Sequence, residues 1–148
     1  MSDVERNIGV VRRLEDSFAA RDHDAIRGLI AADFVPHTPG SEMLPAGVEG
    51  AIMANEGAWS YFPDKKTEIL DIFGEGDRVV SHVRMTGTNT GAPLDWAGLM
   101  EATGKPIDND WVQISRHADD GTIVETWAQQ DVPKLLMQLG AMPAPGGM

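Results

Sequence analysis

The apolar residues of this chain change their spacing halfway along, and this change limits the possible folds more than any other feature. In the first half they recur at helical spacing, beginning with Val4, Ile8, Val11, Leu14 and Phe18. In the second half, short segments of strand character are separated by glycine-containing turns. Helices followed by an antiparallel meander predict an α+β fold, with the helices packed on one face of a curved sheet.

Capping residues and turns set the boundaries of the expected elements. Ser2 and Glu5 form a capping box at the start of the first helix, and Asp131 caps the last one. The helices are expected in a segment that ends near Ala20, in a short segment after Asp22 or Asp24, at residues 48–62, and after Asp131. Pro36 makes its neighbourhood extended. The expected strands cover residues 67–73, 78–88, 107–117 and 122–129.

Length, charge and composition exclude several classes of protein. The 148 residues fit one domain, residues 1–148, with a flexible tail at 142–148. A net charge of -11 would repel phosphate backbones, so we expect no nucleic-acid partner. Without cysteine, disulfides, thiol catalysis and cysteine-ligated metals are excluded. The N-terminus has neither a basic start nor an apolar run, and no apolar stretch approaches about 20 residues, so we expect a cytoplasmic protein without membrane contact.

Several short motifs follow one another in the second half of the chain. They are Gly76-Asp77-Arg78-Val79-Val80, Gly87-Thr88-Asn89-Thr90-Gly91, Thr103-Gly104-Lys105, the run from Asp120 to Trp127, Asp131, and Gln138-Leu139-Gly140. This ordered set resembles the SnoaL-like polyketide cyclases of the nuclear-transport-factor-like superfamily. The resemblance implies a cone-shaped barrel with a short C-terminal helix, three N-terminal helices and a deep apolar pocket. It also implies ring closure by intramolecular aldol condensation, with no metal and no cofactor.

Three residues are the candidate catalytic groups: Asp131, His37 and Asn109. The resemblance places the general acid/base at Asp131. An aspartate beside an apolar cavity has its charged form disfavoured, whereas a helix N-terminus favours the charge, so capping and proton transfer oppose each other. His37 has a side chain suited to proton transfer near pH 7, and its alternative interpretation is a solvated loop residue.

Pairing of the last two strands predicts the surroundings of Asp131. A tight turn at residues 119–121 puts Asn109 opposite Gln130 and Trp111 opposite Ala128, within reach of Asp131. Trp127 is four residues before Asp131, which predicts that the two share a face. The candidate substrate-binding residues are Trp59, Phe62, His82, Asn89, Trp111 and Trp127. The alternatives are core packing for Trp111 and Trp127, and an outer-face position for His82. At position 89 the family often carries histidine.

Two other functions fit the same fold. An epoxide hydrolase or epoxide-opening cyclase needs an Asp-Arg-Asp arrangement, to which Arg84, Asp108 or Asp110 would contribute if Arg84 faced the pocket. A non-catalytic small-molecule-binding module needs only the pocket. In each case the partner is an apolar or aromatic small molecule, and the outer face of the sheet is expected to build a homo-oligomer, with a dimer favoured.

Overall fold

The computed structural model describes residues 2–143. The helices are α1 (Asp3–Ala20), α2 (His23–Leu29), α3 (Val48–Tyr61) and α4 (Val132–Gln138). The strands are β1 (Ile30–His37), β2 (Lys66–Glu75), β3 (Arg78–Thr88), β4 (Pro106–His117) and β5 (Ile123–Gln130). Most of the predicted tail, residues 144–148, lies outside the described residues.

Side-chain caps begin three of the helices where the sequence predicts them. Ser2 Oγ accepts a hydrogen bond from the backbone N–H of Glu5 at 3.1 Å. Asp22, rather than Asp24, caps α2 through the N–H of Ala25 at 3.1 Å. Asp131 caps α4 in the same way. These carboxylate and hydroxyl oxygens satisfy first-turn N–H groups that have no partner within the helix.

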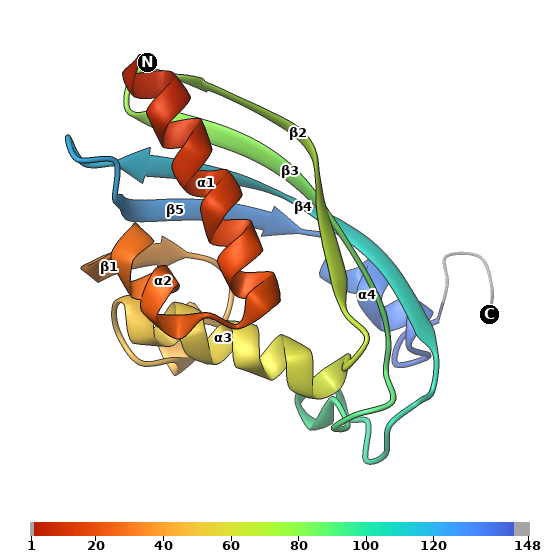
Figure 1. Cartoon of the computed structure of the whole chain (residues 1–148). Helices are drawn as coiled ribbons and strands as arrows, with labels where there is room; N and C mark the ends of the chain where they lie inside the picture. The colour runs from red at the N-terminus through yellow and green to blue at the C-terminus, as the bar shows by residue number, and fades with distance from the viewer. Residues whose placement is uncertain (1, 144–148) are drawn as a thin grey trace.

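The five strands form one mixed sheet in the order β1-β5-β4-β3-β2. β1 runs parallel to β5, and every other pair is antiparallel. In Figure 1 the sheet curves around α1, which crosses in front of it, while α2 and α3 close the lower side. The helix α4 lies at the other end of the sheet, beyond the end of β5. The predicted α+β architecture with helices on a curved, mainly antiparallel sheet is confirmed.

The register between β4 and β5 differs from the predicted one by two residues. Trp111 lies opposite Gln130, and Gln113 lies opposite Ala128. The cause is a bulge near His117, together with a wider turn closed by the hydrogen bond from Ala118 N to Thr122 O. An offset of two keeps every side chain on its predicted face, whereas an offset of one would have exchanged the faces.

Strand pairing divides the sheet into an inner face under the helices and an outer face. On β3 the inner residues Val79, Val83 and Met85 are buried, whereas the outer Arg78 and Arg84 are exposed. The inner side chains meet the helices in two apolar clusters. One contains Val10, Val11, Leu14, Ile26, Ile30, Phe34, Val48, Ile52, Val79 and Ile123. The other contains Phe62, Met85, Leu94, Ile107, Leu135 and Leu139.

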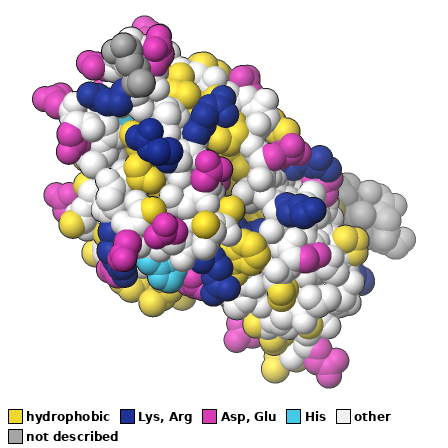
Figure 2. Space-filling view, in the orientation of Figure 1, with side chains coloured by type: hydrophobic (Ala, Val, Ile, Leu, Met, Phe, Trp, Pro, Cys, Tyr) yellow, Lys and Arg dark blue, Asp and Glu magenta, His cyan; other side chains and the backbone are white. Residues whose placement is uncertain are grey.

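Acidic and basic side chains are interspersed over the surface that carries α1 in Figure 2, with small apolar patches between them. Such mixing leaves no single-sign field on this side of the molecule, even though the net charge is -11. None of the helices within residues 2–143 combines the length and apolar character needed to cross a membrane.

Candidate ligand-binding and catalytic site

Asn109 is the most unusual polar residue of the inner face. It lies on β4 opposite Met85 and has no exposed surface. Its Nδ2 donates a hydrogen bond of 3.3 Å to the main-chain carbonyl of Asp131. Its Oδ1 is the only buried side-chain polar atom in the described part of the chain that has no hydrogen-bond partner. A native structure rarely leaves such an atom unpaired unless a water, an ion or a ligand supplies the donor.

Asp131 lies at the junction where β5 ends and α4 begins. Its Oδ1 accepts a hydrogen bond from the N–H of Lys134 at 3.0 Å, so the predicted helix cap is confirmed. The residue is exposed, which leaves its carboxylate accessible while its main chain contacts Asn109. The side chain of Lys134 is directed to another carboxylate, because its Nζ lies 3.8 Å from Asp110 Oδ1.

Trp111 and Phe62 lie on the apolar side of this site. Trp111 is partly buried and packs against the second apolar cluster, to which Phe62 belongs. The ring of Phe62 meets that of Tyr61 edge to face, with centroids 6.3 Å apart. The structure therefore brings Asn109, Trp111 and Phe62 together near the start of α4. For Asn109 and Trp111, this agrees with their predicted position near Asp131.

Trp127 and His37 lie on the outer face of the sheet, away from the inner face that carries Asn109. The prediction that Trp127 shares a face with Asp131 required the strand to continue to Asp131, but β5 ends at Gln130. Trp127 pairs with Ile114 and His37, all on the outer face. The His37 ring stacks on Trp127 with centroids 5.2 Å apart, and His37 Nε2 lies 2.7 Å from Glu125 Oε2. The imidazole expected near the pocket is therefore held on the outer face by its hydrogen bond with Glu125 and its stacking on Trp127.

His82 and Arg84 also lie on the outer face, the alternative that the sequence favoured. His82 Nε2 is 2.5 Å from Asp110 Oδ2. Arg84 makes a two-pronged contact with Asp108 at 2.9 and 2.7 Å. These hydrogen bonds hold the pKa of Asp108 below its usual range, so both partners stay charged. Arg84 points away from the inner face, so the condition set for the alternative epoxide-opening function, an Arg84 that faces the pocket, is not met.

Asn89 and Trp59 are tied to the backbone. Asn89 has no exposed surface, and its carboxamide bonds to Tyr61 O, Ala92 O and the N–H and Oγ1 of Thr103. It therefore fastens the connection between β3 and β4 to the end of α3. Trp59 Nε1 donates to Phe18 O at 3.3 Å, which fixes its ring at the end of α1.

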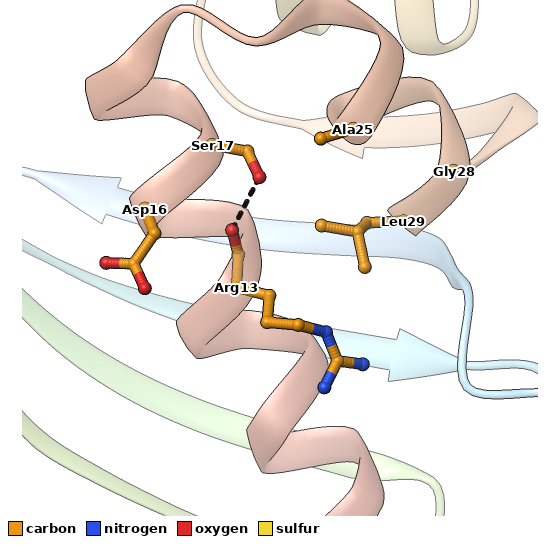
Figure 3. A pocket seen from close by; sticks show the side chains of 6 residues that line it. All are labelled: Arg13, Asp16, Ser17, Ala25, Gly28 and Leu29. Carbon is orange, nitrogen blue, oxygen red and sulfur yellow. Dashed lines mark hydrogen bonds between the residues drawn. The ribbon is translucent and has the colours of Figure 1, made fainter.

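Two hollows beside α1 include none of the predicted site residues. One, about 400 Å³, lies between α1 and α2, and Figure 3 shows Leu29 and Arg13 on its walls. Ser17 Oγ in this hollow donates to the carbonyl of Arg13 at 2.7 Å, so the hydroxyl is occupied within its own helix. The other, about 280 Å³, lies between α1 and β2. The deep pocket that the family resemblance implies stays a prediction.

Sequence reasoning missed two charged residues: Glu15, which lines this second hollow, and Lys65, which interacts with Glu15 electrostatically. Burial raises the pKa of Glu15 to about 7, despite the nearby Lys65. Burial likewise lowers the pKa of Lys65. A signal for Glu15 was present, because it follows Val11 by four residues and lies next to Leu14, so helical spacing places it beside the apolar stripe of α1.

The fold and the order of motifs can now be compared with known proteins. The sequence profile of the SnoaL-like polyketide cyclases matches residues 8–139. The chain belongs to this family. No curated protein gives a significant match. Family membership accounts for the ordered motifs of the second half, and it leaves the reaction of this SnoaL-like chain to be argued from its own residues.

Solved structures show the same fold. IdmH, a proposed polyketide cyclase from Streptomyces antibioticus, is 30% identical with a TM-score of 0.76, and the match covers 90% of this chain and 98% of IdmH. A SnoaL-like protein from Jannaschia sp. CCS1 is 24% identical with a TM-score of 0.78 and 97% of each chain covered. An NTF2-like protein from Burkholderia pseudomallei K96243 is 16% identical with a TM-score of 0.70, covering 94% of this chain and 98% of its own.

Proposed function

We propose that this SnoaL-like chain closes a ring in a polyketide-like small molecule by an intramolecular aldol reaction, with Asp131 as the general acid/base. The observation that carries the proposal is the contact between Asn109 and Asp131. Asn109 Nδ2 donates to the main-chain carbonyl of Asp131, which places a buried carboxamide whose oxygen has no partner beside a residue with an accessible carboxylate. Family membership and the likeness to IdmH support the reaction class.

The proposed step conserves all atoms of the substrate. The Asp131 carboxylate takes a proton from a carbon between two carbonyl groups, and an enolate forms. The enolate carbon attacks a second carbonyl carbon of the same molecule, so one C–C bond forms and that C=O bond becomes an alkoxide. The alkoxide takes the proton back from Asp131. No oxidant, reductant or further reactant is needed.

Asn109 would orient the substrate during this step. Its Oδ1 accepts hydrogen bonds only, so it suits an enol or hydroxyl O–H of the substrate. A group that reaches Oδ1 has to displace a neighbouring side chain, because the atom is shielded from solvent. Met85, on the paired strand, is flexible enough to repack around a ligand. Holding the chain in a reactive shape beside Asp131 is the main contribution expected of the site.

Turnover of an aromatic polyketide ester with one activated CH₂ and a suitably placed ketone tests the proposal. Asp131→Asn should lower the rate of ring closure by about 100-fold or more. Asp22→Asn is the matched control, because Asp22 also caps a helix but lies on α2. Equal turnover by the wild type and Asp131→Asn would remove Asp131 from the mechanism. No turnover by the wild type would favour the non-catalytic binding module.

We also propose that the outer face of the sheet packs against a second copy of the chain. A row of paired outer-face residues crosses all five strands and consists of Phe73, Val80, Ile114, Trp127 and His37. Phe73, at one end of the row, is 57% exposed. The Arg84–Asp108 ion pair lies beside the row on the same face. A copy turned by a two-fold rotation would meet this row, which is apolar except for His37, with its own row.

A further inference from the structure

A second polar cluster lies on the helix side of the sheet, where α1, α3 and β2 meet. Lys65 precedes β2 directly and is only 9% exposed. Asn55 and Trp59 come from α3, and Glu15 comes from α1. Figure 1 shows the end of α3 running into the start of β2 below α1. Charged side chains are seldom buried this far unless they are paired or serve a ligand.

Lys65 is held in place but only partly satisfied. Its Nζ donates to Asn55 Oδ1 at 3.4 Å and lies 4.9 Å from the centroid of the Trp59 ring. Asn55 Nδ2 in turn donates to Phe18 O at 3.0 Å, which fixes the direction of the carboxamide. An ammonium group has three N–H donors, and one long hydrogen bond leaves donor capacity unused.

Glu15 is near Lys65 but makes no direct contact with it. The two attract each other electrostatically, but within residues 2–143 they form neither a hydrogen bond nor a salt bridge. Glu15 lines the hollow of about 280 Å³ between α1 and β2. The other charged residues around this hollow are Arg12 and Asp16 on α1 and Glu68 on β2.

Strand pairing relates this hollow to the inner face that carries Asn109. Its β2 wall includes Thr67 and Ile69, which pair with Met85 and Val83 of β3. Met85 in turn pairs with Asn109 on β4. Neighbouring strands are about 4.8 Å apart, so β2 and β4 are separated by roughly 10 Å. A flat molecule of two or three fused rings spans that distance.

We propose that Glu15 and Lys65 form a second polar subsite that holds a carbonyl oxygen at the far end of a flat, polyketone-type ligand bound along the inner face. The Lys65 ammonium and the protonated Glu15 carboxyl both donate to that oxygen. Trp59 forms an aromatic wall of the subsite. The identity of the ligand class rests on the proposed function, whereas the subsite itself requires no chemistry at Asp131.

Binding of 2-(hydroxymethyl)anthraquinone tests the subsite, because this probe has carbonyl acceptors and no group that ionises near neutral pH. Tryptophan fluorescence quenching gives the dissociation constant. At pH 6, Lys65→Met should raise it about tenfold or more, since a hydrogen bond to a charged group is lost. The dissociation constant of the wild type should also rise between about pH 6 and 8, because Glu15 ionises and can no longer donate a hydrogen bond to the probe. Glu15→Gln keeps an N–H donor, so its binding should remain and become independent of pH.

Two controls separate this subsite from the catalytic proposal. Glu75→Gln, at the end of β2 on the outer face, should bind the probe like the wild type. Asp131→Asn should also retain binding and its pH dependence, whatever happens to ring closure. The inference is overturned if the wild type does not bind the probe, or if Lys65→Met binds normally. It is also overturned if the probe's dissociation constant still depends on pH in Glu15→Gln. This second variant provides a test even if Lys65→Met fails to fold.

Discussion

The side-chain amide of Asn109 donates a hydrogen bond to the main-chain carbonyl of Asp131, 22 residues further along the chain. This bond ties the middle of the inner face to the start of α4. It also turns Asn109 Oδ1 away from every donor in the described residues. A buried carboxamide whose oxygen has no hydrogen-bond partner lowers the free energy of unfolding in the absence of a ligand. Such a cost is expected at a binding site, where the ligand supplies the missing partner.

Asn109 and Asn89 offer a matched pair for stability, because both side chains are fully buried. Asn89→Leu removes four side-chain hydrogen bonds, and we expect the free energy of unfolding to fall by about 3 kcal/mol or more. Asn109→Leu removes one bond and one unpaired acceptor, so a change of less than about 1 kcal/mol is expected. Urea denaturation measures both. Equal losses would mean that Asn109 has a partner the structure does not show.

The pH dependence of stability should reveal Glu15. Its pKa is raised from 4.5 to about 7, so its contribution to stability is present below pH 4.5 and is lost as the pH rises through about 7. The free energy of unfolding of Glu15→Gln, relative to the wild type, should therefore increase between about pH 5 and 8. The slope is at most about 1.4 kcal/mol per pH unit. A constant difference over this range would show that Glu15 titrates normally.

His117 should have the opposite effect. It is buried, with Nδ1 2.8 Å from Gly121 O and Nε2 2.8 Å from Ser115 Oγ, and burial lowers its pKa below 6.5. Its contribution to stability is therefore present above pH 6.5 and is lost as the pH falls through the lowered value. Histidine NMR titration measures that pKa directly. A value of 6.5 or above would contradict the expected cost of a buried imidazolium.

The outer-face dimer predicts a sharp difference between two substitutions, one in the row and one on a helix. Ile114→Glu places a charge in the middle of the apolar row and should raise the dimer dissociation constant by about 100-fold or more. Met53→Glu is the control, because Met53 is 52% exposed but lies on α3. Sedimentation velocity distinguishes the two. A monomeric wild type, or an Ile114→Glu variant that stays dimeric, would refute this contact.

Much of the fold was predictable because its signals are local. The capping oxygens of Ser2, Asp22 and Asp131 mark helix starts, and the alternation along 78–88 indicates which side chains of β3 are buried. Such signals depend on the spacing of a few neighbouring residues. They are independent of where the rest of the chain lies.

The remaining features depend on residues far apart in sequence. The bulge near His117 changes the β4–β5 register, and the parallel pairing of β1 with β5 places His37 beside Trp127 on the outer face. Neither bulges nor parallel partners have a reliable short-range pattern. For the same reason no local pattern marks Lys65, which folding buries beside Asn55.

Proton abstraction by Asp131 is tested most directly by solvent deuterium exchange into a substrate analogue that lacks the ketone to be attacked. Such an analogue can lose its activated proton but cannot close the ring, so exchange isolates the first step. Asn caps a helix as well as Asp does, and Asp131→Asn should change the free energy of unfolding by less than about 0.5 kcal/mol. The account predicts enzyme-dependent exchange that Asp131→Asn slows by about 100-fold or more. Exchange at the wild-type rate in a folded Asp131→Asn variant would contradict it.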